Sequence, residues 1–411
     1  MRFLLATALL FSSSCFAASH IVQFQSAEHD AAGSEVRVFF SHGDVGHLNP
    51  TLHLPNGLPA TYGQLVAMGD FYGIADKPIA FGKTALERES RFIDIFNTLA
   101  TNPNAVPEFP RIISVMQEEE TALADGLKKG EKPENIYHQI GDHINREYNG
   151  ITGGSSTGDF WYLKEGRYLK LSAVDFDHFG QDAMTAYQAG HQVALKAAIA
   201  ARVSGDPKQL ELAYAMNAFA CHFLSDLFAS GHLRTPRREL SSMVTPSVVG
   251  ALLVTYMHNE ENEYGLRVHD QQNHRWVVYG DDYYFDPQNT ENRIRQRSAL
   301  QASADEIFSA FQTGVIPPDQ VTDLIPQPDE SVDLGQNDIA PLFYYDKQSN
   351  KLMRRSDLTN VYDRHWTSNW WGIWTLIELK KQRGLTSMMN AQLGQSPSVV
   401  AEIKSEEENI P

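Results

Sequence analysis

The stretch PKQLELAYAMNAFACHFLSDLFASGH, residues 207–232, carries apolar residues at helical spacing and has a glycine near its end, Gly231. Apolar residues three and four apart predict an amphipathic helix, and a glycine directly after the last of them is typical of a helix end. We therefore expect a helix over residues 207–230. Its apolar side would comprise Leu210, Ala213, Met216, Ala220, Phe223, Leu224 and Leu227.

Further helices are expected on both sides of this stretch. The same spacing predicts a helix over 179–202, which stops at Gly205-Asp206-Pro207 and would pair with helix 207–230 as an antiparallel hairpin. Alternating residues over 267–279 predict a β-hairpin. The sequence thus predicts a mainly α, multi-helix domain with a small β-hairpin and a C-terminal extension. Its remaining helices are expected over 62–68, 114–129, 245–263, 292–312 and 363–382.

The composition is acidic and otherwise ordinary. The chain has 411 residues and a formal net charge of −17, which argues against a strongly basic nucleic-acid binder. Residues 1–17 join Arg2, an apolar run and the ending Cys15-Phe16-Ala17, a pattern typical of a secretory signal peptide. We therefore expect export through the periplasm to the outside. No other stretch approaches the roughly 18 uninterrupted apolar residues that a membrane-spanning helix needs.

The positions of the histidines indicate the domain organisation. Nearly all fifteen lie before residue 290. We therefore expect a signal peptide at 1–17, a catalytic domain over 18–290 and a supporting C-terminal region over 291–411.

The helix over 207–230 also carries the first candidate metal ligands. His222 and Asp226 are four residues apart, so both side chains lie on one helix face, and His232 follows just after the helix stop. Imidazole nitrogen and carboxylate oxygen are common zinc ligands. For the cluster taken alone, a buried histidine paired with a structural carboxylate is the alternative interpretation.

A second set of candidates lies near the end of the helix over 245–263. At 3.6 residues per turn, Glu261 lies about 60° around the helix from His258, and Glu260 lies about 160° away. Glu261 is therefore the better expected ligand, although a frayed helix end could present Glu260. Asn262 occupies the position four residues after His258.

Three upstream residues complete a set large enough for several metal ions. Asp70 closes the short helix over 62–68, and His178 stands at the start of the helix over 179–202. His42 precedes a Gly-Asp pair still earlier in the chain. Each of these residues alone would fit a surface or turn role.

Together these positions resemble the zinc-dependent phospholipase C family over roughly residues 40–290. The most specific part is the His-x3-Asp-x5-His segment at 222–232. The Gly-Asp-Phe-Tyr-Gly stretch at 69–73 and Asp177-His178-Phe179 resemble its bacterial branch of secreted phosphatidylcholine-preferring enzymes, including those of intracellular pathogens.

The resemblance implies a mostly helical domain whose cleft binds three zinc ions. It implies that one pair of ions is held by Asp70, His178, His222 and Asp226. A further zinc would be held by His232, His258 and the Glu261 or Glu260 carboxylate, with His42 as the early histidine. Asp70 would be the catalytic base. The implied reaction is hydrolysis of a glycerophospholipid at a membrane surface to diacylglycerol and a phosphorylated head group.

The sequence departs from the family at two points. No tryptophan follows the signal peptide to supply the family's N-terminal ligand, so either His42-Gly43-Asp44 substitutes for it or the third site is incomplete. Asn262 stands where an acid is expected four residues after His258.

Two other functions remain open at this stage. One is a zinc-dependent single-strand nuclease, which shares the ligand pattern, although the acidic charge disfavours it. The other is a non-catalytic zinc-binding protein that adheres to membranes. It would use an aromatic stripe of Trp366, Trp370 and Trp374 on the expected helix over 363–382, for which core packing is the alternative role.

Overall fold

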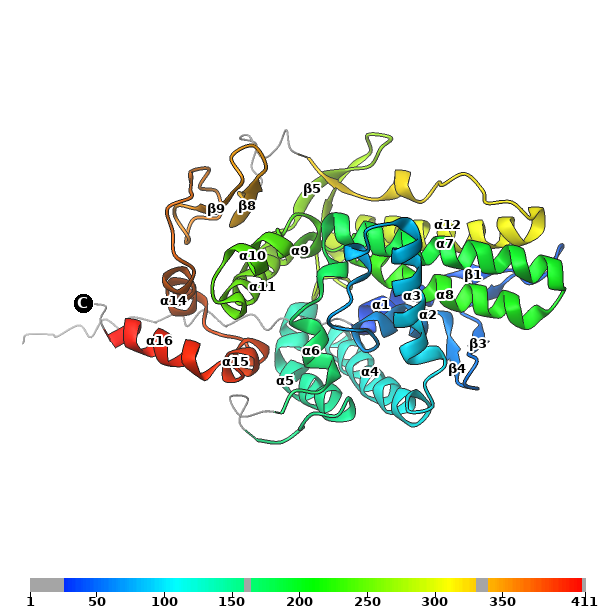
Figure 1. Ribbon diagram of the computed structural model, residues 1–411, viewed down its shortest axis with the longest axis horizontal. Helices are drawn as coiled ribbons and strands as arrows, with labels where there is room; N and C mark the ends of the chain where they lie inside the picture. The colour runs from blue at the N-terminus through cyan, green and yellow to red at the C-terminus, as the bar shows by residue number, and fades with distance from the viewer. Residues whose placement is uncertain (1–25, 159–163, 330–338, 409–411) are drawn as a thin grey trace, which may run out of the picture.

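The computed structural model describes residues 26–158, 164–329 and 339–408 (Figure 1). The predicted signal peptide at 1–17 lies outside these residues. The fold is mainly helical, with 61% helix and 8% strand, as the sequence predicts. Among the described residues, no helix combines the length and apolar composition needed to cross a bilayer.

The first and larger hydrophobic core is built around the predicted helical hairpin. α7 and α8 pack against each other and against α12, which lies beside both (Figure 1). Gly205, in the left-handed conformation with φ of 66°, ends α7, and Asp206 caps α8 by accepting a hydrogen bond from the amide of Lys208. The helices around this core are α1 (Ser26–Gly33), α2 (Tyr62–Ala67), α3 (Ala85–Ala100), α4 (Ala105–Lys128), α5 (Pro133–Ile151), α6 (Arg167–Ser172), α7 (Gly180–Ser204), α8 (Pro207–Asp226) and α12 (Thr290–Thr313).

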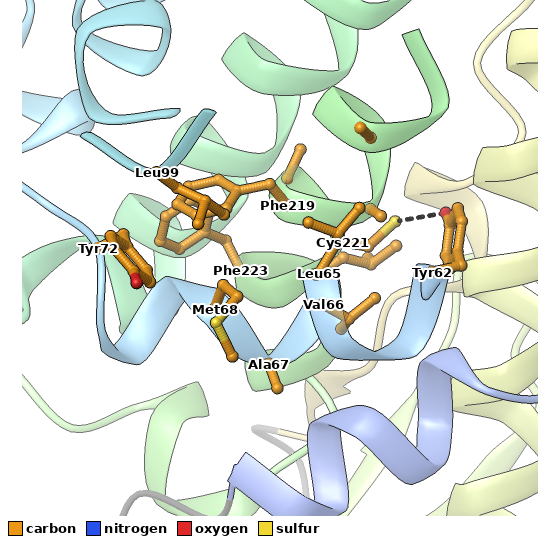
Figure 2. Packing of buried hydrophobic residues seen from close by; sticks show 14 of the residues in the cluster. Tyr62, Leu65, Val66, Ala67, Met68, Tyr72, Leu99, Phe219, Cys221 and Phe223 are labelled. Carbon is orange, nitrogen blue, oxygen red and sulfur yellow. Dashed lines mark hydrogen bonds between the residues drawn. The ribbon is translucent and has the colours of Figure 1, made fainter. Parts of the chain in front are cut away.

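α2 lies across α8 and is held there by buried aromatic and aliphatic side chains. Figure 2 shows Leu65 and Met68 of the α2 region facing Phe219 and Phe223 of α8. The Tyr62 hydroxyl lies 3.6 Å from the Cys221 thiol in the same layer. This packing fixes the short 3₁₀ turn η1 (Met68–Asp70), which continues from α2, against the end of α8.

A second core lies beside the first. Here α10 and α11 pack together, and the C-terminal helices gather on α11 (Figure 1). Its helices are α10 (Arg237–Met243), α11 (Ser247–Tyr264), α14 (Gly372–Arg383), α15 (Ser387–Gly394) and α16 (Pro397–Glu408). The short helix α9 (Ser230–Leu233) packs on α11, and its Leu233 belongs to a third, smaller cluster with β5 and β6.

The strands form small antiparallel sheets at the edges of these cores. The predicted hairpin over 267–279 is confirmed as β5 (Leu266–His269) with β6 (Arg275–Val278), and β7 (Gln327–Pro328) adds to it. The other pairings are β1 (Arg37–Val38) with β2 (His47–Leu48), β3 (Thr51–His53) with β4 (Pro59–Thr61), and β9 (Lys351–Arg355) between β8 (Phe343–Asp346) and β10 (Trp366–Thr367). The 3₁₀ turns other than η1 are η2 (Ile79–Phe81), η4 (Phe176–His178), η5 (Pro287–Asn289) and η6 (Thr322–Leu324).

The C-terminal region differs from the prediction. The expected helix over 363–382 begins only at Gly372, so Trp366 and Trp370 precede it and the three tryptophans do not form one helical stripe. The indole of Trp366 donates to the carbonyl of Pro341, and that of Trp370 donates to Leu352, so both serve local packing. The expected boundary at residue 290 runs through one core, because α12 follows it and packs on α7 and α8.

Candidate metal centre

Histidine and aspartate side chains from both cores gather into three groups. Within each group the candidate ligand atoms lie within 4.8 Å of one another. Group 1 is His29, His222 and Asp226; group 2 is Asp70, His178 and His222; group 3 is His232, His258 and Asp281. Groups 1 and 2 share His222, so the two candidate sites adjoin.

Group 2 is the most buried of the three. Nε2 of His222 lies 3.1 Å from Nδ1 of His178 and 3.5 Å from Oδ1 of Asp70. His222 comes from α8, His178 from η4 and Asp70 from η1, so three separate elements supply the ligands. All three side chains are buried.

Group 1 joins the same α8 residues to the first described helix. Nε2 of His29, on α1, lies 3.5 Å from Oδ1 of Asp226. The other oxygen of Asp226 lies 3.1 Å from Nδ1 of His178 in group 2. Asp226 therefore faces group 1 with one oxygen and group 2 with the other, which is the position of a bridging carboxylate.

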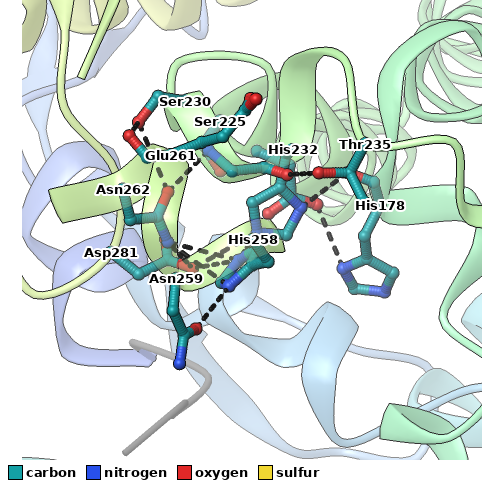
Figure 3. A network of polar contacts seen from close by, with 12 residues as sticks. His178, Ser225, Ser230, His232, Thr235, His258, Asn259, Glu261, Asn262 and Asp281 are labelled. Atoms are coloured by element: carbon teal, nitrogen blue, oxygen red, sulfur yellow. Dashed lines mark hydrogen bonds and ion pairs between the residues drawn. The ribbon is translucent and has the colours of Figure 1, made fainter. Parts of the chain in front are cut away.

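Group 3 lies where α9, α11 and the loop after β6 meet (Figure 3). The Nε2 atoms of His232 and His258 are 3.1 Å apart. Each lies close to Oδ2 of Asp281, at 3.2 Å and 3.0 Å respectively. The three ligand atoms thus form a compact triangle.

Main-chain carbonyls orient two of the histidines. Nδ1 of His222 donates to the carbonyl of Val66 at 2.9 Å, and Nδ1 of His232 donates to that of His178 at 2.8 Å. Because a carbonyl only accepts, each Nδ1 carries a proton, and in the neutral ring Nε2 keeps its lone pair. Such outer hydrogen bonds are characteristic of metal-binding histidines.

The residues fit a set of divalent cations. Oδ1 of Asp70 is buried and has no hydrogen-bond partner within the described chain, and the buried Oδ2 of Asp226 faces the imidazole of His178 at 3.1 Å. Buried carboxylate oxygens are normally satisfied, so Oδ1 of Asp70 needs another partner. Zinc with ligands at about 2.1 Å in a tetrahedron places them about 3.4 Å apart, close to the spacings above. A metal ion would satisfy Oδ1 of Asp70.

The titratable side chains of the centre shift one another's pKa values. Burial lowers the pKa of His178, but the charge of Asp226 outweighs burial and raises it to about 9. Burial likewise lowers the pKa of His232, and Asp281 raises it to about 10. For Asp70, burial raises the pKa well above its ordinary value. Metal ions would take over from protons as the positive partners of these carboxylates.

Two glycines allow the elements to approach closely. A Cβ atom at Gly69 would lie 2.2 Å from the His222 ring, and one at Gly231 would lie 2.6 Å from the carbonyl oxygen of His258. Both contacts are closer than carbon atoms tolerate. Glycine is therefore required where η1 meets α8 and where α9 meets α11.

Most of the predicted ligands come together in the structure. Asp70, His178, His222, Asp226, His232 and His258 all belong to the three groups. His42 does not: it is exposed in the loop between β1 and β2 and lies in none of the groups found among the described residues.

The two predicted glutamates point to other partners. Oε1 of Glu261 accepts a hydrogen bond from Nε of Arg234 at 2.8 Å. Both oxygens of Glu260 accept from Arg355, at 2.6 Å and 2.9 Å. The helical angle was thus a poor guide, because both carboxylates are engaged by arginines instead of facing His258.

Two members of the groups were missed in the sequence. His29 was left unassigned, although its place between Glu28 and Asp30 was a weak signal. Asp281 follows directly on the Gly280 that ends the hairpin, and only tertiary structure brings it to His258. The amide of Asn262 supports it: Nδ2 lies 3.5 Å from Asp281, and Oδ1 accepts from the amide of Gly231 at 2.6 Å (Figure 3).

A small pocket of about 50 Å³ opens onto group 3. His232, His258 and Asp281 line one part of it, and residues of α11 and α15 line another. The centre is therefore reached from the side of the second core.

Comparison of the chain with protein-family models, with curated proteins and with solved structures gave no match. The geometry of the centre is therefore the basis for proposing a function.

Proposed function

We propose that this chain is a secreted zinc metallophospholipase C that hydrolyses glycerophospholipids, with phosphatidylcholine as the expected substrate. The observation that carries the proposal is the joining of groups 1 and 2 through His222 and Asp226, with group 3 held to them by the His178 carbonyl. Adjoining sites in which nitrogen and oxygen ligands hold divalent cations are common in enzymes that hydrolyse phosphodiesters.

The ligand chemistry supports zinc. The groups offer imidazole nitrogens and carboxylate oxygens, and the one free cysteine of the described chain, Cys221, belongs to none of them. Zinc prefers four ligands of this kind, and a catalytic zinc keeps an open position. Because Nε2 is the one free nitrogen of His222, it can bind the ion of group 1 or of group 2 but not both. Two or three protein ligands per ion leave room for water or substrate, and three ions are proposed in all.

Metal ions bound here would neutralise the phosphoryl oxygens, lower the pKa of water to roughly 7 and stabilise the leaving alkoxide. Asp70 would orient the attacking water and accept its proton, since its Oδ1 is buried, has no hydrogen-bond partner in the described chain and faces His222.

The proposed fold is that of the zinc-dependent phospholipase C family. The mainly helical architecture and the gathering of six of the family-matched positions are consistent with it. Export follows from the signal-like residues 1–17, and the proposed partner is phospholipid at a membrane surface.

The direct experiment measures zinc-dependent hydrolysis. Purified protein is stripped with a chelator, reloaded with zinc and assayed on p-nitrophenyl phosphocholine and on dihexanoyl phosphatidylcholine. We expect zinc to restore release of p-nitrophenol and phosphocholine. Asp226→Ala should remove the activity, and Asp125→Ala, an exposed aspartate on α4, should not.

Two results would contradict the proposal. One is no release from either substrate after reloading, with Asp226→Ala indistinguishable from wild type. The other is rapid degradation of single-stranded DNA without phospholipid cleavage, which would identify the nuclease alternative.

A further inference from the structure

Ser225, a buried residue of α8, contacts both histidines of group 1. Its hydroxyl oxygen lies 2.7 Å from Nδ1 of His29, on α1, and 2.7 Å from the main-chain carbonyl oxygen of His222. The rings of the two histidines are themselves close, with centroids 4.4 Å apart. One hydroxyl group thus links candidate ligands from two helices.

These two contacts determine the direction of each hydrogen bond. A carbonyl oxygen only accepts, so Ser225 donates its single hydroxyl proton to the carbonyl of His222. Its hydroxyl oxygen is then left as an acceptor for Nδ1 of His29. Nδ1 of His29 therefore carries the proton of the neutral ring, and Nε2 keeps its lone pair.

The lone pair of His29 faces the place proposed for the ion of group 1. Its Nε2 lies 3.5 Å from Oδ1 of Asp226. In this tautomer both atoms are acceptors, so their lone pairs repel each other unless a cation lies between them. The hydrogen bond from Ser225 therefore prepares His29 to bind a metal ion.

Group 1 depends strongly on the orientation of His29. The one free nitrogen of His222 can serve group 1 or group 2. When it serves group 2, the remaining members of group 1 are His29 and Asp226. With so few protein ligands, the hydrogen bond that holds the His29 ring should have a large effect on the affinity for this ion.

α12 holds Ser225 from the other side. Nε2 of Gln296 donates to the main-chain carbonyl of Ser225 at 3.0 Å, and the Gln296 side chain is buried. The hydroxyl of Ser225 is thus part of a fixed network, because its own main chain is tied to a neighbouring helix. Residues beyond 290 therefore support the centre as well as the core.

The same arrangement recurs in the other groups, where an oxygen atom accepts from Nδ1 and leaves Nε2 free. The oxygen is the carbonyl of Val66 for His222 and the carbonyl of His178 for His232. Main-chain carbonyls cannot be removed by substitution. Ser225 provides the corresponding oxygen from a side chain, so its role can be tested by mutation.

We propose that Ser225 is a positioning residue of group 1, whose hydroxyl holds the His29 imidazole in the tautomer and orientation that present Nε2 to the ion. The inference rests on the metal centre of the proposed function. It assigns a role in that centre to a residue that belongs to none of the three groups.

The test compares hydroxyl removal inside and outside the centre. Ser225→Ala removes the acceptor, and Ser225→Thr retains a hydroxyl. Ser303→Ala is the matched control, because Ser303 is another buried serine whose hydroxyl contacts Asn217 and Tyr187 instead of a group member. The zinc content of each purified chain is measured over a series of buffered free zinc concentrations.

We expect Ser225→Ala to need at least about tenfold more free zinc than wild type to bind its last ion, since lost outer hydrogen bonds typically cost ten- to a hundredfold in metal affinity. Ser303→Ala should match wild type, and Ser225→Thr should bind zinc more tightly than Ser225→Ala. Equal zinc affinities of Ser225→Ala and Ser303→Ala would overturn the inference.

A spectroscopic readout separates positioning from a general structural role. Nitrogen NMR of protein labelled in its histidine rings, at saturating zinc, should show a proton on Nδ1 of His29 that exchanges slowly with solvent in wild type. In Ser225→Ala this proton should exchange faster. The Nδ1 proton of His222 should stay protected, because the Val66 carbonyl still holds it. Faster exchange at both histidines, or at neither, would contradict the proposed role.

Neither readout requires hydrolysis, so the inference and the proposed function fail in different ways. If no phosphodiester is hydrolysed but Ser225→Ala binds its last ion more weakly, the role of Ser225 stands and the phospholipase function is wrong. If hydrolysis depends on zinc but Ser225→Ala binds zinc as wild type does, the function stands and the role of Ser225 is wrong.

Discussion

The main-chain carbonyl of His178 accepts a hydrogen bond from Nδ1 of His232 at 2.8 Å, while the ring of His178 belongs to group 2. One residue thus contributes a candidate ligand to one group and orients a ligand of another. This bond links the two cores, because His178 precedes α7 and His232 lies on α9. The three groups therefore form one centre.

Asp281 is expected to be the carboxylate ligand of group 3. Asp281→Asn keeps the shape of the side chain but removes the charge, so zinc at group 3 should bind at least about 100-fold more weakly, since even outer partners cost ten- to a hundredfold. Glu261→Gln should keep group 3 loaded, because Glu261 binds Arg234. Competition with a zinc chelator measures the zinc affinity of both variants. If Glu261→Gln weakened zinc binding more than Asp281→Asn did, Glu261 would be the ligand instead.

His29 is expected to hold the ion of group 1 together with Asp226, beside the shared His222. Removing its imidazole in His29→Ala should leave one zinc fewer per chain. His143→Ala, which removes an exposed imidazole paired with Glu118, should leave the zinc content unchanged. Elemental analysis measures the zinc content of both variants. Equal zinc content in the two would exclude His29 as a zinc ligand.

The sequence could predict the part of this centre that local geometry determines. Helical spacing places His222 and Asp226 on one face of α8, and the stop at Gly231 returns His232 towards them. Their positions at helix ends make Asp70, His178 and His258 candidates, and the resemblance implies that they share the site. The helix angle of Glu261 could not reveal that Arg234 binds its carboxylate, and Asp281 joins His258 only through the fold of the hairpin. His42 lies on a loop that the fold directs into solvent.

The helices and strands likewise divide into those that the sequence predicts and those that depend on tertiary contacts. The α7 and α8 hairpin and the β5 and β6 hairpin could be predicted, because apolar periodicity is a local property. The late start of α14 could not, since residues 366–367 pair with β9 and Trp370 packs on the second core. These tertiary contacts override the helical spacing of the tryptophans.

Glu119 should make the stability of the protein depend on pH. Burial raises its pKa to about 8, with the charges of Glu120 and Asp70 acting in the same direction and the Tyr148 hydroxyl opposing them. Since the folded pKa lies above the unfolded one, stability is greatest below the unfolded pKa and falls as pH rises towards about 8, by roughly 1 kcal/mol per pH unit.

Glu119→Gln removes this titration. Urea unfolding between pH 5 and about 8 should therefore show a smaller loss of stability in the variant than in wild type. The matched control is Glu118→Gln, since Glu118 is an exposed neighbour on the same helix. Identical pH profiles for Glu119→Gln and wild type would show that Glu119 is not buried as described.

Glu260 should stabilise the attachment of the C-terminal region. Its buried carboxylate binds the buried Arg355 of β9 and also Arg383 of α14. Glu260 therefore joins α11 to β9 and α14. Glu260→Gln leaves buried arginine charge without a full partner and should cost about 3–5 kcal/mol. Glu378→Gln breaks a more exposed pair with Arg354 and should cost at most about 1 kcal/mol. Urea denaturation compares the two, and equal losses would contradict the account.

The central claim is that three adjoining groups hold zinc, and the zinc content of the purified chain tests it most directly. We expect three ions per wild-type chain. His222→Ala should retain fewer, because the one free nitrogen of His222 serves the ions of groups 1 and 2. Fewer than two tightly held ions in the wild type, or equal zinc in wild type and His222→Ala, would contradict the claim.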